Sequence, residues 1–237
     1  MRRLVVLGTG TGVGKTWVTT ALCRSLAHRD PLEPVLAVKL IETGYDRARP
    51  PLDSDAAALA AACHLCQPPE PHPYYAFPAP VSPFRAAGLA GKTLYLSDIV
   101  QYFESARAAL AAARADGGWS VAETAGGVFS PLTSTETNFE LAALLAPAGL
   151  WALVAPDALG VIHDVTATLE AMRARGRTPD LVILNRARPA DASTGGNADE
   201  LRALGVTVPI AHTDDLASVA PLADTVARLA TARRDAT

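Results

Sequence analysis

Short apolar runs alternate with longer amphipathic segments along this chain. The runs are rich in Val, Leu, Ile and Ala, as expected for strands buried on both faces, and they cover residues 4–7, 35–41, 119–122, 150–154, 181–184 and 208–211. The segments between them repeat apolar residues at helical spacing, at residues 15–27, 96–115, 161–175 and 217–229. This alternation predicts an α/β fold in which a doubly wound, mostly parallel sheet is flanked by helices.

Residues 68–83 interrupt the alternation because they contain many prolines and few helix formers. They are predicted to form a long surface loop within one fold rather than a linker between two folds. The chain has 237 residues, 49% of them hydrophobic, which is enough for a substantial core. We therefore expect a single domain over residues 1–237.

The net charge indicates which binding partners to expect, and the cysteine content indicates the redox compartment. The formal net charge of -3 gives no electrostatic reason to expect nucleic acid, and no apolar run is long enough to span a membrane, so small molecules are the expected partners. The three cysteines are too few for a disulfide scaffold and indicate a reducing cytoplasm. Cys63 and Cys66 have the spacing of a metal or redox pair, but no second pair accompanies them, so that role is disfavoured.

The sequence Gly-Thr-Gly-Thr-Gly-Val-Gly-Lys-Thr occupies residues 8–16, directly after an apolar run and directly before a helical pattern. This is the context that a P-loop requires, because backbone N–H groups and the start of a helix then converge on an anion. Lysine suits the outer phosphates of ATP, and threonine can ligate Mg²⁺. We expect the nucleotide to contact the loop and the first helical turn at Gly12, Val13, Gly14, Lys15, Thr16 and Trp17.

Two competing motif interpretations fail on spacing. The loop has one residue more than the common P-loop pattern, but a dinucleotide fingerprint would need glycine at Val13 or Lys15 and is disfavoured. A second Gly-Lys-Thr, at residues 91–93, has no strand before it and has Ala86 where the first glycine belongs. We interpret the second copy as a coincidence.

Lysines and carboxylates follow the predicted strands. The chain has only three lysines, and Lys39 stands at the end of the second apolar run, where a parallel sheet faces its ligand crevice. Glu123 ends the run at 119–122 and is a candidate ligand for the Mg²⁺ that ATP chemistry needs. Asp53 and Asp55 flank the start of an Ala-rich helix, where either could be an N-cap, and position alone does not choose between them.

Taken together, five segments resemble dethiobiotin synthetase in order and spacing. They are the P-loop, residues 39–44, Ser54-Asp55, Pro80-Val81-Ser82-Pro83 and Glu123-Thr124-Ala125-Gly126-Gly127. The resemblance implies a ligase of biotin biosynthesis, which uses ATP and Mg²⁺ to close 7,8-diaminononanoate with CO2 into dethiobiotin. In that reaction a carbamate of the diamine is phosphorylated, and the neighbouring amine then displaces phosphate.

The resemblance also implies roles for individual residues. It implies that Lys15 and Lys39 are the catalytic residues. It implies that Thr16, Asp55 and Glu123 are the metal ligands, and Asp55 is thereby preferred over Asp53. Further expected contacts are Thr11 and Thr43 with the substrate, and Glu123, Gly126 and Asn185 with the nucleotide, Asn185 at the adenine edge. A homodimer is implied as well, in which residues 159–162 of the partner subunit reach the carboxylate tail of the substrate.

Several positions depart from the family pattern, namely Leu40, Arg85, Thr124 and His163. They leave open a related ligase with another substrate, or a nucleotide-binding subunit without catalysis. A second alternative is an ATPase switch like ParA or MinD, although those proteins carry a signature lysine where this chain has Gly10. An amidoligase related to the cobyrinic acid diamide synthases is a third, but the chain has no room for the glutamine-hydrolysing domain that those enzymes normally carry.

Overall fold

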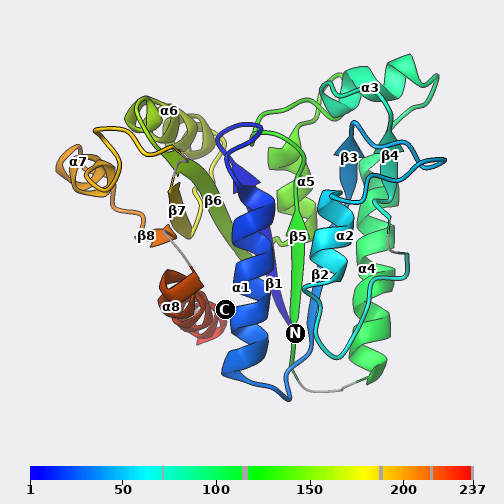
Figure 1. Cartoon of the computed structure of the whole chain (residues 1–237), viewed down its shortest axis with the longest axis horizontal. Helices are drawn as coiled ribbons and strands as arrows, with labels where there is room; N and C mark the ends of the chain where they lie inside the picture. The colour runs from blue at the N-terminus through cyan, green and yellow to red at the C-terminus, as the bar shows by residue number, and fades with distance from the viewer. Residues whose placement is uncertain (71, 114–116, 187–188, 214–215, 236–237) are drawn as a thin grey trace.

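The computed structural model of the chain describes all residues except 71, 114–116, 187–188, 214–215 and 236–237 (Figure 1). A 6-stranded parallel sheet in the order β2-β5-β1-β6-β7-β8 forms its centre, beside a 2-stranded parallel sheet of β3 and β4. The strands are β1 (Arg2–Gly8), β2 (Val35–Lys39), β3 (Ile41–Thr43), β4 (Tyr75–Phe77), β5 (Trp119–Glu123), β6 (Leu150–Asp157), β7 (Leu181–Arg186) and β8 (Ile210–Thr213). The helices are α1 (Lys15–Arg29), α2 (Asp55–Ala60), α3 (Pro83–Leu89), α4 (Leu96–Ala113), α5 (Asn138–Leu145), α6 (Val161–Ala174), α7 (Asn197–Ala203) and α8 (Leu216–Asp235).

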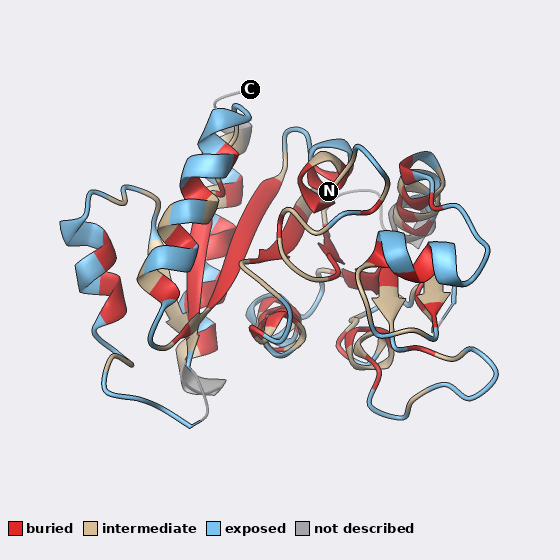
Figure 2. Ribbon diagram, turned by 90° about the horizontal axis from the view of Figure 1, so that it is seen from above, coloured by how far each residue is buried: buried red, intermediate tan, exposed pale blue. Residues whose placement is uncertain are grey.

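Helices cover both faces of the large sheet, which explains why its strands are continuous apolar runs. In β1, Leu4 and Val6 pack with α1, α2 and α8, whereas Val5 and Leu7 pack with α4, α5, α6 and α7 on the other face. Strands β1, β2, β5, β6 and β7 are therefore mostly buried, whereas the edge strand β8 is only partly buried (Figure 2). This arrangement confirms the predicted α/β fold with a doubly wound parallel sheet.

The second apolar run, at 35–41, was predicted as one strand and divides into two. β2 ends at Lys39, Leu40 is buried, and the chain continues as β3 in the small sheet. The partner of β3 is β4, within the segment 68–83 that was predicted to be a loop throughout. That prediction was wrong in part, because a strand of three residues gains its hydrogen bonds from a partner distant in sequence, which local composition does not reveal.

Three short helices were not predicted, namely α3, α5 and α7. The start of α5 carries a signal that local sequence does contain. Thr137 and Glu140 form a capping box, in which the side chain of each residue accepts a hydrogen bond from the backbone N–H of the other. Neither Asp53 nor Asp55 is the N-cap of α2, because Ser54 occupies that position and accepts a hydrogen bond from the Ala57 N–H at 3.1 Å.

Cys63 and Cys66 lie beside the edge strand β2 and are not joined by a disulfide. Both thiols bind backbone carbonyl groups, and burial raises the pKa of Cys63 and raises that of Cys66 to about 12. A raised pKa keeps a thiol protonated and unreactive at neutral pH. In the described part of the chain, no cluster of three or more His, Cys, Asp or Glu side chains could hold a metal, and no helix is both long and apolar enough to cross a membrane.

Candidate functional site

The P-loop connects the end of β1 to the start of α1. Its last glycine, Gly14, is the N-cap of the helix and has φ 86°, in the left-handed region that favours glycine. A Cβ atom at this position would overlap the side-chain amide of Asn185. The glycine is therefore needed both for the backbone turn and for the close approach of β7.

Lys15 folds back over the loop and is only 6% exposed. Its Nζ donates a hydrogen bond to the Gly10 carbonyl at 2.8 Å. Burial lowers the pKa of Lys15 to about 8, and the nearby charge of Lys39 contributes to this decrease. An anion placed beside the ammonium group would stabilise its charged form, so this lysine favours a phosphate ligand.

Lys39, Glu123 and Asp55 form a buried charged cluster beside the P-loop. The Lys39 Nζ lies 2.6 Å from Glu123 Oε1 and 2.7 Å from Asp55 Oδ2. Thr16 joins the cluster because its hydroxyl donates to Glu123 Oε1 at 2.7 Å. Lys39 and Glu123 are paired in register at the carboxyl ends of β2 and β5, next to β1, so the sheet brings them to the P-loop.

The cluster favours the charged forms of Lys39 and Asp55. Burial by itself lowers the pKa of Lys39 and raises that of Asp55. The opposite charges of Glu123 and Asp55 outweigh burial at Lys39 and raise its pKa, and the charge of Lys39 outweighs burial at Asp55 and lowers its pKa. The ammonium form of Lys39 and the carboxylate form of Asp55 are therefore both favoured at neutral pH.

The donor set of this cluster fits a magnesium ion. Glu123 is fully buried, and its Oε2 atom has no hydrogen-bond partner. A buried carboxylate oxygen without a partner is costly, and a cation beside it would remove that cost. Mg²⁺ prefers carboxylate and hydroxyl oxygens, which Glu123, Asp55 and Thr16 provide on one side of the P-loop.

A cleft of about 560 Å³ opens beside this cluster. The structure brings most of the predicted site residues to its walls, namely Thr11, Gly12, Gly14, Lys15, Thr16, Trp17, Lys39, Thr43, Asp55 and Gly126. Glu123 lies behind them, bound to Lys39 and Thr16. The remaining wall includes residues 80–83, so the Pro-rich segment belongs to the site.

Val13 and Asn185 lie on the opposite side of the P-loop from Lys39. The Asn185 side-chain amide donates to the Val13 carbonyl at 3.2 Å, and its oxygen accepts from the Thr213 hydroxyl at 3.3 Å. Their place follows from the sheet order, in which β7 lies two strands from β1 on the side away from β2. The P-loop thus has the Lys39 and Glu123 cluster on one flank and the Asn185 side-chain amide on the other.

Asn138 is a site residue that the sequence did not reveal. It is fully buried at the start of α5, and its side-chain amide donates to the carbonyl groups of Ala125 at 2.7 Å and Gly127 at 2.8 Å. These bonds hold the loop after Glu123 against the P-loop, where the Val128 N–H donates to Gly8 at 2.9 Å. The capping box at Thr137 marks this position, but only the fold identifies the acceptors.

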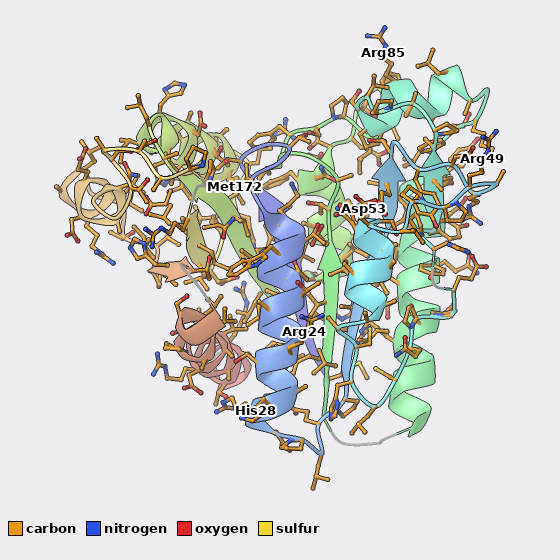
Figure 3. The ribbon with its side chains drawn as sticks, in the orientation of Figure 1. Arg24, His28, Arg49, Asp53, Arg85 and Met172 are labelled. Carbon is orange, nitrogen blue, oxygen red and sulfur yellow. The ribbon has the colours of Figure 1, made fainter. Side chains whose placement is uncertain are left out.

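The four departures from the family pattern lie away from the cleft walls. The Thr124 hydroxyl donates to the Val6 carbonyl at 3.1 Å within the sheet, and Leu40 is buried in the core. Arg85 extends from α3 into solvent (Figure 3). His163 is exposed in the first turn of α6. None of these four side chains lines the cleft.

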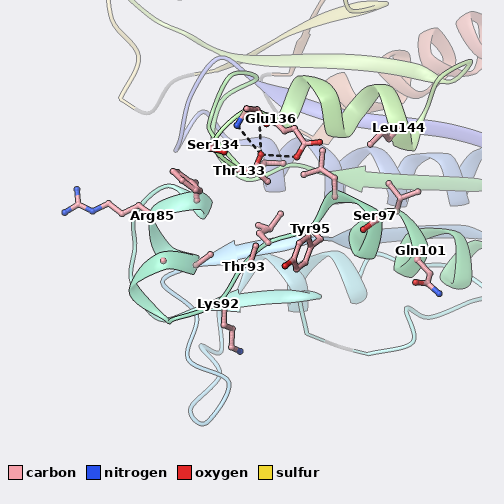
Figure 4. A pocket seen from close by; sticks show the side chains of 18 of the residues that line it. Arg85, Lys92, Thr93, Tyr95, Ser97, Gln101, Thr133, Ser134, Glu136 and Leu144 are labelled. Atoms are coloured by element: carbon pink, nitrogen blue, oxygen red, sulfur yellow. Dashed lines mark hydrogen bonds between the residues drawn. The ribbon is translucent and has the colours of Figure 1, made fainter.

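A larger hollow of about 1340 Å³ lies between α3, the start of α4, and α5 (Figure 4). Its lining is mainly apolar and includes the exposed side chains of Phe84, Leu89, Tyr95 and Leu144. None of the predicted site residues lines it. The smaller cleft, with its charged cluster, is therefore the candidate for phosphate chemistry.

Comparison with known proteins supports the same conclusion. A family model described as an AAA domain matches residues 2–223. The ATP-dependent dethiobiotin synthetase BioD of Anaeromyxobacter dehalogenans is 40% identical over 213 residues, 89% of each chain. This chain belongs to the dethiobiotin synthetase family. A family member from a Caulobacter species is 39% identical over 179 residues, covering 73% of this chain and 71% of that relative.

The family shares its fold with other P-loop proteins. A ParA family ATPase from Chlorobium tepidum aligns with 99% of this chain and 96% of its own, with a TM-score of 0.51 and 13% identity. At that identity the likeness extends to the fold alone, and it does not support the alternative of an ATPase switch. The dethiobiotin synthetase relatives are far closer in sequence.

Proposed function

We propose that this chain is an ATP- and Mg²⁺-dependent ligase that closes 7,8-diaminononanoate with CO2 into dethiobiotin. The observation that carries the proposal is the 40% identity, over 89% of each chain, to a protein named ATP-dependent dethiobiotin synthetase. The cluster of Lys39, Glu123 and Asp55 beside the P-loop supports it, because phosphoryl transfer depends on positioning and charge stabilisation. No protein nucleophile is required.

The proposed reaction has two chemical steps. In the first, a carbamate oxygen of the substrate attacks the terminal phosphorus of ATP, and the bond to ADP breaks. Lys15 and Lys39 supply the cations that stabilise the charge on the transferred group. In the second, the neighbouring amine attacks the carbamate carbon, phosphate leaves and the ring closes. A magnesium ion held by Thr16, Asp55 and Glu123 would neutralise phosphate charge.

The proposal assigns separate residues to the two substrates. Thr11 and Thr43 contact the diamine, and Gly126 and the P-loop contact the nucleotide, whose adenine edge meets Asn185. Residues 1–237 act as one domain. Residues 159–162 include the 87% exposed Leu159 and the start of α6, and they reach the substrate of a second subunit in a homodimer. Three free cysteines fit a reducing compartment, so we place the enzyme in the cytoplasm.

The experiment measures ADP release by the purified protein with Mg²⁺, ATP and bicarbonate, with and without 7,8-diaminononanoate, and then the mass of the product. We expect the diamine to stimulate ADP release and the product to gain a urea carbonyl. Lys39→Ala should lower turnover by at least about 10²-fold and leave ATP binding, measured by calorimetry, largely intact. ATP binding without any response to the diamine would contradict the proposed substrate and retain the nucleotide site.

A further inference from the structure

Glu42 reaches from β3 to the start of α2. Its side chain is partly buried, and both carboxylate oxygens are engaged, Oε1 by the Asp55 N–H at 3.0 Å and Oε2 by the Ala56 N–H at 3.1 Å. These N–H groups belong to the first two residues of α2, which have no acceptor within the helix. A carboxylate at this end of a helix also faces the positive end of the helix dipole.

The start of α2 therefore has two different acceptors. Ser54 is the local N-cap and binds the Ala57 N–H from within the same turn. Glu42 binds the two preceding N–H groups from another element, so it joins the helix to β3. Ser54 stabilises the turn itself, whereas Glu42 determines where that turn lies relative to the sheet.

The position of this turn matters because Asp55 is its first residue. The Asp55 carboxylate contacts Lys39, the last residue of β2, and β3 follows β2 after the single residue Leu40. Glu42 is thus three residues from Lys39 in sequence and bonded to the backbone of Asp55. The same short segment supplies the ammonium group and holds the carboxylate that meets it.

We propose that Glu42 is a positioning residue that holds Asp55 in place to bind magnesium. The proposal rests on the role of Asp55 proposed above. Glu42 also lines the cleft, so a contact with a substrate amine is the competing role. Both of its oxygens already accept backbone hydrogen bonds, which favours positioning over substrate binding.

The test compares Glu42→Ala with Ser54→Ala, which removes the other acceptor of the same helix start. ATP dissociation constants are measured by calorimetry in EDTA and over a series of Mg²⁺ concentrations, without the diamine. Mg²⁺ is expected to lower the ATP dissociation constant. For Glu42→Ala we expect the Mg²⁺ concentration that gives half of this decrease to rise at least about tenfold, with the ATP dissociation constant in EDTA unchanged. Glu42→Gln, with one amide oxygen in place of two carboxylate oxygens, should give a smaller shift.

Ser54→Ala should destabilise α2 without changing the Mg²⁺ response. An equal Mg²⁺ shift in Ser54→Ala would overturn the proposal, because the effect would then be helix stability alone. It would also be overturned if Glu42→Ala left the Mg²⁺ response unchanged, and a raised KM for the diamine in a separate kinetic assay would then indicate the competing role in substrate binding. The binding measurements do not use the diamine. A wild-type protein that fails to catalyse the proposed reaction would therefore not affect this test of Glu42.

Discussion

Gly-Lys-Thr occurs twice in this chain, at residues 14–16 and 91–93, in opposite surroundings. The first copy follows a strand and begins α1, with Lys15 buried and Thr16 bound to Glu123. The second copy follows α3, and Lys92 is exposed at the hollow between α3, α4 and α5, which it helps to line (Figure 4). The same three residue types therefore occur in two unrelated structural settings.

The difference lies in which end of a helix the motif occupies. At the start of α1 the helix presents unpaired N–H groups and the positive end of its dipole, which attract phosphate. At the end of α3 the N–H groups of Gly91 and Lys92 are already bound to the carbonyl groups of Gly88 and Ala87. The second copy is a glycine-terminated helix end, whose dipole opposes an anion.

The largest difference between the two copies is expected when the lysine of each is replaced by alanine. Lys15→Ala should reduce diamine-dependent ADP release by about 10²–10³-fold, because a buried cation aimed at the phosphates is lost. Lys92→Ala should leave turnover unchanged. Steady-state kinetics of both variants checks this, and comparable losses in the two would show that the buried position of Lys15 is not what matters.

Alanine at each glycine compares the two turns by stability. Gly14→Ala should lower the free energy of unfolding by about 3 kcal/mol, through the left-handed backbone and overlap with Asn185. Gly91 has φ 62° but open space around it, so Gly91→Ala should cost only about 1 kcal/mol. Urea unfolding measures both, and equal costs would mean that Asn185 moves aside freely.

The smallest effect is expected at the two threonines. Thr16→Ala removes a hydroxyl bound to Glu123 and should raise the Mg²⁺ concentration needed for half-maximal activity about tenfold. Thr16→Ser should restore the wild-type requirement, and Thr93→Ala should not alter it. A Mg²⁺ titration of ADP release distinguishes these variants, and an unchanged Thr16→Ala titration would remove Thr16 from the metal site.

Local sequence predicted the parts of the site that lie at strand ends. Lys39 and Glu123 end strands, and Lys15 follows the first strand through the P-loop. The rule that parallel strands share one ligand edge brings the three together. Asn138 and Glu42 were not foreseen as supporting residues, because they bind backbone groups far away in sequence. A side chain that acts on a distant backbone leaves no periodic pattern in the sequence.

The sequence by itself determined the alternation of strands and helices, the P-loop and the strand-end lysine and carboxylate, since these depend on residues that are neighbours along the chain. Only the tertiary structure decided that the chain after β2 pairs with β4 outside the main sheet. It also showed that Asp55, which the family resemblance preferred over Asp53, contacts Lys39. Those outcomes depend on hydrogen bonds and charge contacts between remote segments. Such contacts form only when the sheet has brought the segments together, so no local pattern specifies them.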